Sequence, residues 1–284
     1  MRAVADTLGT TTSTVSQQIA VLASEMGTPL TEPIGRGVRL TPAGRRLAEH
    51  ARGILGAVEA ARVDLRPGAE PSGALRVAGF ATAIRYLLPI TTRLAASHPR
   101  VRVLIREHEP AEALELLAAD QADLALTYDY NLAPAAVEPA TERTRLWTTR
   151  WGLGVPAGVR APKGTAPEVF ARFRASDWIG NSRNTADENV IRTVASMVEF
   201  TPSIAHQADS LELVQDMIAA DMGVGLLPLG QAVRAGVRIL PLTDPHIEMR
   251  AYATARSGRQ NWPLLALVTS LLRQASQEAG PRLL

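Results

Sequence analysis

The feature that most constrains the fold is a short run rich in proline and glycine, RPGAEPSG at residues 66–73. Two prolines and two glycines within eight residues cannot continue a helix, so this run predicts a linker. Residues before it have helical patterns, apart from one stretch between Pro29 and Leu40, whereas residues after it alternate between strand and helix patterns. A chain of 284 residues is therefore expected to form two parts that are joined near residue 67.

The N-terminal part predicts two helices separated by a polar turn. The first covers Arg2 to Leu8, and the second runs from about Ser13 to Met26, with Thr12 or Ser13 as its N-cap. One face of the second helix is apolar, and its other side carries small or polar side chains with no acid before Glu25. Such a face suits contact with DNA phosphates and base edges, although an ordinary solvated helix surface has the same pattern.

A glycine-flexed turn with two arginines follows, over Gly35–Leu40. It suits a β-hairpin whose tip contacts the DNA backbone or minor groove, and a solvated surface turn is the alternative. Residues 1–66 hold 8 arginines and 6 acids, while the remainder of the chain, which has a total net charge of +2, is balanced. The excess positive charge therefore lies in the part that would face phosphates.

Thr41-Pro42 begins a long helix in the preferred order of cap and proline. Its apolar residues recur at heptad spacing, in the order Leu47, Ala51, Ile54, Val58, Ala61 and Leu65. Such a seam predicts dimerisation through this helix. Burial of the seam against its own chain is the alternative.

From Gly73 onward the pattern is α/β. Strands are expected at Ala74–Phe80, Val101–Glu107, Asp123–Tyr128, Gly152–Pro156, Trp178–Gly180, Pro202–Gln207, Gly223–Pro228, Arg238–Pro241 and Met249–Ala255. Helices are expected at Tyr86–Ser97, Ala111–Ala119, Pro167–Phe173, Ala186–Glu199, Leu211–Asp221, Leu229–Ala235 and Trp262–Ser276. Two such sets predict two lobes with mostly parallel sheets and helices on both faces, and a ligand-binding cleft at the carboxyl ends of the strands.

Composition excludes several classes of function. Cysteine is absent, which excludes disulfides, thiol catalysis and thiolate metal sites within these residues. The five histidines show no metal-ligand spacing, and no nucleophile elbow or phosphate-binding loop is present, so no catalytic group, metal or cofactor is expected. The chain shows neither a signal peptide nor an apolar run of about 18 residues, so it is expected to be cytoplasmic and without a membrane partner.

Several segments, in their order along the chain, resemble the LysR-type transcriptional regulators. The N-terminal segments are Thr12–Leu22, Gly27–Leu30 and Gly35–Gly44, and the downstream segments are Gly73–Val77, Leu87–Pro89, Ala122–Leu126 and Gly223–Pro228. The resemblance covers essentially the whole chain. It implies an α/β fold class in which a winged helix-turn-helix and a linker helix precede a two-lobed effector domain resembling type 2 periplasmic binding proteins.

The resemblance implies four segments. These are a DNA-binding domain over residues 1–40, a linker and dimerisation helix over 41–66, a hinge over 67–73 and an effector-binding domain over 74–284. Lobe I of the last takes about 74–151 and 252–284, and lobe II takes about 152–251. The implied partners are double-stranded promoter DNA, a small-molecule effector and further copies of the chain, in a dimer or tetramer.

Site residues follow from the same resemblance, position by position. The DNA-contacting residues would be Thr12, Ser13, Ser16, Gln17 and Arg36. The effector-contacting residues would be Thr82 and Ser182, with Tyr128 and Asn181 added because they lie at predicted strand ends facing the cleft. For these pocket residues, a helix cap or a loop hydrogen bond is the alternative role.

The sequence departs from the family pattern at its start. The family has a further helix before the segment that begins this chain, and Thr31 and Pro33 replace an aromatic residue and an arginine. Without that helix, apolar residues such as Val4 and Leu8 are expected to lack a covering partner, so either the true start lies upstream or DNA binding is weakened.

Two other classes of function remain open from the residues alone. One is a solute-binding protein with a degenerate helical segment at its N-terminus, which would share the two-lobed architecture. The other is an α/β enzyme, for which the sequence offers no catalytic group.

Overall fold

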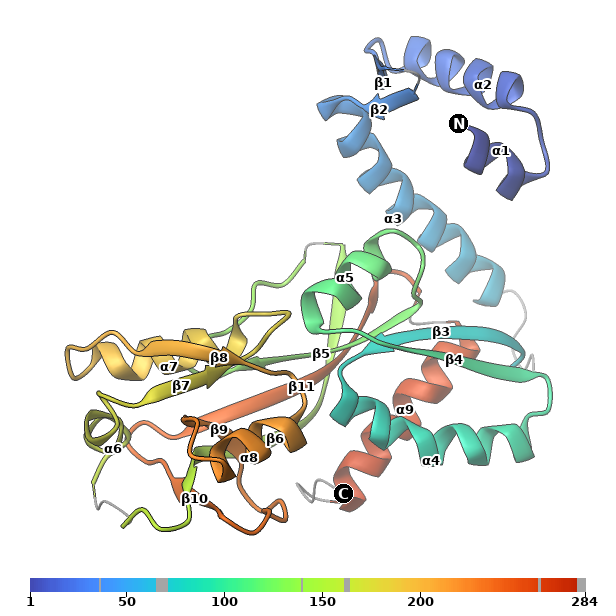
Figure 1. Cartoon of the computed structure of the whole chain (residues 1–284). Helices are drawn as coiled ribbons and strands as arrows, with labels where there is room; N and C mark the ends of the chain where they lie inside the picture. The colour runs from blue at the N-terminus through green and yellow to red at the C-terminus, as the bar shows by residue number, and fades with distance from the viewer. Residues whose placement is uncertain (36, 65–70, 139, 161–163, 260–261, 280–284) are drawn as a thin grey trace. The chain divides into compact units, whose positions relative to one another are not determined.

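The computed structural model describes residues 1–35, 37–64, 71–138, 140–160, 164–259 and 262–279. The chain forms two compact units, Met1–Arg62 and Val63–Leu284 (Figure 1). The division falls just before the proline- and glycine-rich run from which two parts were predicted.

The first unit holds three helices and a hairpin within its described residues. They are α1 (Arg2–Leu8), α2 (Thr12–Glu25), β1 (Thr31–Ile34), β2 (Gly37–Leu40) and α3 (Pro42–Asp64). The strands pair antiparallel from Thr31 opposite Leu40 to Ile34 opposite Gly37, which makes the predicted hairpin. The expected N-cap of α2 was wrong, because Thr11 takes this position and its hydroxyl accepts from the backbone N–H of Thr14 at 3.1 Å.

The hairpin is tied to the start of α3 by Thr41. Its side chain accepts from the backbone N–H of Gly44 at 3.0 Å, which caps α3, and donates to the carbonyl of Pro29 at 2.7 Å. Leu30, next to this joint, is buried, as are Ala5 of α1 and Val15 of α2. Val4 and Leu8 are 48% and 64% exposed, as expected for apolar side chains on α1 without a covering partner.

Apolar residues of α3 are exposed at the predicted seam. Ile54 and Val58 are 64% and 45% exposed, and dimerisation through this seam stays a prediction. The side chain of Ala61 and the whole of Leu65 lie outside the described residues.

The second unit is built on one mixed sheet. Its strands are β3 (Gly73–Gly79), β4 (Val101–Glu107), β5 (Leu124–Tyr130), β6 (Thr141–Pro156), β7 (Asp177–Gly180), β8 (Ser203–Gln207), β9 (Val224–Pro228), β10 (Val237–Pro241) and β11 (Ile247–Arg256). The strand order is β4-β3-β5-β11-β6-β9-β7-β8, with β10 paired to β6.

The expectation of mostly parallel sheets was wrong. Parallel pairing is confined to two groups, β4-β3-β5 and β9-β7-β8. Between them, β11 pairs antiparallel with both β5 and β6, and β6 pairs antiparallel with β9. The long strands β6 and β11 carry the chain from one parallel group to the other and back, which requires opposite directions.

Helices cover both faces of each parallel group, as predicted (Figure 1). They are α4 (Ala81–Ser97), α5 (Pro110–Ala118), α6 (Ala166–Arg172), α7 (Ala186–Ser196), α8 (Leu211–Ala219) and α9 (Pro263–Ala279). In lobe I, α4 and α9 pack with the main core, whereas α5 packs with a separate cluster that includes Ala78 and Ala125. In lobe II, α6 and α7 join the main core around Trp178, and α8 packs with the cluster around Ile179. Neighbouring strand residues face opposite ways, so these separate clusters mark the two faces of the sheet.

The expected helix over Leu229–Ala235 is absent, and the chain turns there instead. Gly230 has a φ of +86°, outside the helical region. The backbone N–H of Arg234 donates to the side chain of Gln215 at 2.9 Å rather than to a helical carbonyl.

Within the described ranges, no helix combines the length and apolar character needed to cross a membrane.

Candidate functional site

The polar face of α2 is open to solvent. Thr12, Ser13, Ser16 and Gln17 are all exposed, and none of their side chains makes a hydrogen bond to another described residue. Spacings of four along a helix place Thr12 beside Ser16 and Ser13 beside Gln17, so the four side chains form one surface. Their hydroxyl and amide groups are free to contact another molecule.

The structure describes one of the two arginines of the hairpin that follows α2, and that arginine is already paired. Arg39 is paired across the hairpin with Glu32, with 2.6 Å between Nε and Oε1. Arg36, the predicted wing contact, lies outside the described residues.

A cavity of about 200 Å³ lies in the second unit, where the carboxyl ends of its parallel strands meet. Its walls come from both lobes. Thr82 and Arg85 belong to the first turns of α4, Glu107 ends β4 and Glu109 lies just beyond it, and Tyr128 lies on β5. Lobe II contributes residues that follow β7 and β8: Asn181, Asp187, Ala208, Asp209, Ser210, Leu211 and Glu212.

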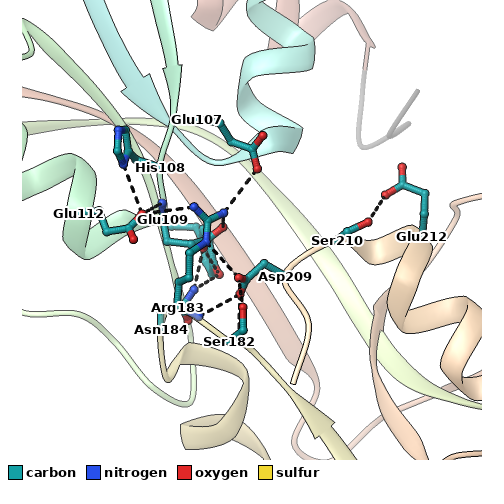
Figure 2. A network of polar contacts seen from close by, with 11 residues as sticks. Glu107, His108, Glu109, Glu112, Ser182, Arg183, Asn184, Asp209, Ser210 and Glu212 are labelled. Atoms are coloured by element: carbon teal, nitrogen blue, oxygen red, sulfur yellow. Dashed lines mark hydrogen bonds and ion pairs between the residues drawn. The ribbon is translucent and has the colours of Figure 1, made fainter. Parts of the chain in front are cut away.

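Glu109 lies at the centre of the polar network on one side of this cavity and is 5% exposed (Figure 2). Its Oε2 accepts from the hydroxyl of Tyr128 at 3.1 Å and from Nδ2 of Asn184 at 2.6 Å. Burial, together with the negative charge of Asp209, raises the pKa of Glu109 to about 7. This carboxyl group therefore gains or loses a proton near neutral pH.

Arg183 joins the acidic side chains of the two lobes (Figure 2). Its Nε lies 3.1 Å from Oδ2 of Asp209, and its terminal nitrogens lie 3.5 Å from carboxylate oxygens of Glu107 and Glu112. A longer contact of 3.8 Å reaches Glu109. One guanidinium is thus shared among four carboxylates.

The side chain of Asp209 is held in place by Ser182 and Arg183. The backbone N–H of Ser182 donates to Oδ1 of Asp209 at 2.9 Å, and the Ser182 hydroxyl is hydrogen bonded to Oδ2. Burial alone would raise the pKa of Asp209, but the donors of Ser182 and Arg183 hold it below its usual value. Asp209 is therefore a fixed negative charge.

Asp187, in the first turn of α7, is a second buried acid on the cavity wall and is 9% exposed. Its Oδ1 accepts from the hydroxyl of Tyr130 at 2.7 Å, and its backbone N–H donates to Oδ1 of Asn181 at 2.9 Å. Burial, with a contribution from the charge of Asp209, raises its pKa to about 6. Among the described residues, no cationic side chain lies within 4.0 Å of this carboxylate.

Three of the four predicted effector residues, Thr82, Tyr128 and Asn181, come together on the cavity wall. Ser182 does not line the cavity and instead holds Asp209, which does. Whether these residues contact an effector stays a prediction.

The acidic residues of the cavity were missed by sequence reasoning. Glu109 and Asp209 lie two residues beyond the ends of β4 and β8, and Tyr128 and Asn181 were chosen because they lie at predicted strand ends. The same argument, applied to every strand end, would have found them. Within the described residues, no group of three or more histidine, cysteine or acidic side chains has an arrangement that could hold a metal ion.

Comparison with known proteins explains why one chain contains both a cavity of this kind and an exposed polar helix face. A family model described as a bacterial regulatory helix-turn-helix protein of the lysR family matches residues 1–45. A second, the LysR substrate binding domain, matches residues 68–277. The chain belongs to the LysR family of transcriptional regulators. Members of this family are DNA-binding regulators rather than enzymes; they bind promoter DNA and small-molecule effectors and form oligomers. As bacterial DNA-binding proteins, LysR regulators work in the cytoplasm.

Individual relatives agree with this assignment. The hydrogen peroxide-inducible genes activator of Haemophilus influenzae is 27% identical over 266 residues, which cover 86% of this chain and 81% of that protein. The HTH-type transcriptional regulator IlvY of Escherichia coli is 26% identical over 273 residues, covering 92% and 89%. Among solved structures, a full-length OxyR variant of Pseudomonas aeruginosa matches with a TM-score of 0.69 at 18% identity, covering 95% of this chain and 88% of that one, which shows a common fold.

Proposed function

We propose that this LysR regulator reads its promoter through the polar face of α2 and that a small molecule in the cavity between the lobes controls this binding. The observation that carries the proposal is the cavity itself. Its polar residues come from the ends of strands in both lobes, so a molecule bound in the cavity would contact both lobes. A bridging ligand favours whichever arrangement of the lobes it contacts best, and so shifts the population of the regulator's states.

On the DNA side, the proposed contacts are Thr12, Ser13, Ser16 and Gln17. Their exposure and lack of internal partners support this role, since each hydroxyl or amide would otherwise be satisfied only by water. Arg36, which lies outside the described residues, is the proposed wing contact. The absence of acidic side chains before Glu25 on α2 removes repulsion from the phosphates.

On the effector side, Thr82, Tyr128 and Asn181 are the proposed direct contacts. Ser182 is proposed to act through Asp209, whose position it fixes. The name of the Haemophilus relative refers to hydrogen peroxide, but this sequence contains no cysteine, so a thiol-based peroxide response within these residues is excluded. Occupancy of the cavity by a small molecule is therefore the proposed input.

We propose that successive segments of the chain have separate roles. Residues 1–40 bind DNA, 41–66 dimerise, 67–73 act as a hinge and 74–284 bind the effector, with lobe I at about 74–151 and 252–284 and lobe II at about 152–251. The long strands β6 and β11 connect the two lobes, which makes them the elements about which the lobes would move.

A gel-shift experiment with the DNA that flanks the gene tests this function. The full chain is expected to retard that fragment at concentrations that leave a shuffled fragment of equal length free, and added salt should weaken the complex. Small-molecule binding without any specific retardation would contradict the proposal, because it is the behaviour of a solute-binding protein.

A further inference from the structure

The walls of the cavity carry an unusual excess of negative charge. Six carboxylates line the cavity or contact the residues that do: Glu107, Glu109, Glu112, Asp187, Asp209 and Glu212. Arg85 and Arg183 are the two arginines among this same set of described residues. Acids therefore outnumber arginines by six to two in and around this cavity.

Neither arginine is free to bind an anion. Arg85 is paired with Glu212, with 2.8 Å between the guanidinium nitrogen and Oε1. Arg183 is shared among Asp209, Glu107, Glu112 and Glu109. An anionic ligand would have to break one of these ion pairs and would add a further negative charge to the cavity.

Asp187 provides the second, independent observation. It lines the cavity, is 9% exposed, and its Oδ2 makes no hydrogen bond or ion pair to any described residue. A buried carboxylate normally has a cationic partner or several donors, because desolvation of the charge is costly. Asp187 has one neutral donor, Tyr130, and an oxygen left over beside the cavity.

The remaining walls suit an organic cation. Phe80, Tyr128 and Trp151 line the cavity, and the rings of Phe80 and Tyr128 lie 4.8 Å apart in an edge-to-face arrangement. Aromatic rings attract cations through their negative faces, and Tyr128 also contacts Glu109. At about 200 Å³, the cavity is smaller than the roughly 300–1,000 Å³ typical of sites for drug-sized ligands.

We propose that the effector of this regulator is a small organic cation, an amine or a guanidine, whose charged group binds Asp187 and Glu109 against the aromatic wall. This inference rests on the proposed effector function of the cavity and names its ligand class. The ammonium or guanidinium group would donate to the unpartnered oxygen of Asp187. Its positive charge would pair with carboxylates that Arg85 and Arg183 do not neutralise.

Calorimetric titration of the full chain with size-matched probes tests the ligand class. Butylammonium and butylguanidinium are the cations, butan-1-ol the neutral probe and butanoate the anion, with Mg²⁺ as an inorganic cation. We expect saturable binding of at least one organic cation and none of the alcohol or the carboxylate. Binding at pH 7 should also release protons, so the heat should change with the ionisation enthalpy of the buffer, because a bound cation favours the ionised form of Glu109.

Asp187→Asn removes the charge and keeps the shape of the side chain. It should weaken binding of the organic cation about tenfold or more, as expected for the loss of a charge-assisted hydrogen bond. Glu188→Gln is the matched control. Glu188 is the next residue on α7, but it pairs with Arg192 at 2.7 Å and does not line the cavity, so its loss should leave binding unchanged.

Equal or tighter binding of butanoate would overturn the cationic class while leaving the cavity as the effector site. Binding of Mg²⁺ alone, or of no probe, would also overturn it, as would an Asp187→Asn variant that binds the cation like the wild-type chain. Failure of the proposed DNA-binding function would be seen separately. The chain would then not retard the promoter fragment in the gel shift, whichever probe binds the cavity.

Discussion

Gln17 is the residue of α2 best suited to distinguish one base from another. A side-chain amide has both a donor and an acceptor, so it can form two hydrogen bonds to adenine in the major groove, whereas a hydroxyl most often makes one. The structure leaves this amide exposed and without a partner among the described residues.

Gln17→Ala is therefore expected to reduce the preference for promoter over shuffled DNA by about 1–3 kcal/mol. Fluorescence anisotropy with the two labelled fragments measures this preference. Gln18→Ala, at the next exposed position, is the control and should retain it. An equal loss of affinity for both fragments would show that Gln17 contacts phosphate and not a base.

Glu109 and Asp187 predict how stability changes with pH. Burial raises the pKa of Glu109 from 4.5 to about 7 and that of Asp187 from 3.8 to about 6. Because both folded values lie above the unfolded ones, folding favours the protonated forms, and this contribution is lost as pH rises through the folded pKa values. The free energy of unfolding should fall between about pH 5 and pH 8, by on the order of 1–3 kcal/mol for each carboxyl group.

Urea unfolding at a series of pH values checks this expectation, and Glu109→Gln should flatten the profile. The charged and titratable groups that act on Glu109 are Asp209, Asp187, Tyr128 and Arg183. Asp209 has a lowered pKa, so its own contribution is lost only at more acidic pH. A wild-type profile that rises from pH 5 to pH 8 would contradict the assignment.

Sequence reasoning could locate individual cavity residues only where local structure decides their position. Tyr128 and Asn181 were found because they lie at predicted strand ends, and they do line the cavity. The partners of Glu109 come from two lobes, since Tyr128 lies 19 residues away along the chain and Asn184 lies 75 residues away. No local pattern contains such a meeting of side chains, so the hydrogen bonds of Glu109 to Tyr128 and Asn184 emerged only from the fold.

At the scale of elements, the joint between the hairpin and α3 depends on Gly44. A Cβ atom at this position would overlap the backbone carbonyl of Leu30, which hydrogen bonds with the N–H of Thr41 at 3.0 Å and has little room to move. Gly44→Ala should therefore destabilise the first unit by about 1–3 kcal/mol, although alanine favours helices elsewhere. Hydrogen exchange of residues 1–62 measures this loss, and unchanged protection there would contradict the prediction.

The helix α3 carries the predicted dimer seam. Ile54→Asp places a charge on the seam and is expected to shift the protein from dimer towards monomer in sedimentation velocity. Leu55→Asp is the matched control, because Leu55 is equally exposed, at 68% against 64%, but is not a seam residue. If Leu55→Asp dissociates the dimer and Ile54→Asp does not, a different face of α3 forms the contact.

Elements with strong hydrophobic periodicity could be predicted, and those without it could not. The helix over Arg2–Leu8 and the strand over Val101–Glu107 have the predicted bounds. The first part of β6, from Thr141 onward, was missed because charged residues such as Arg143 and Arg145 interrupt its apolar pattern. The direction of strand pairing was wrong because it depends on contacts between segments more than 100 residues apart, such as β5 and β11.

At the scale of the whole molecule, a regulator must convert occupancy of a cavity into a change on DNA. The acidic cavity draws its walls from both lobes, and family members act as oligomers, so a ligand that changes the lobes can change how two copies present their α2 helices. A dimer that reads DNA with two such helices requires two half-sites about one helical turn apart, or a multiple of that distance.

DNase I footprinting of the DNA upstream of the gene tests the central claim most directly. The account predicts two protected half-sites related by a two-fold axis, with centres about 10 base pairs apart or a multiple of this. Their protection should be lost in Gln17→Ala at a concentration at which Gln18→Ala still protects. Uniform protection of all sequences, or none at concentrations that saturate the cavity, would contradict the claim that this chain is a DNA-reading regulator.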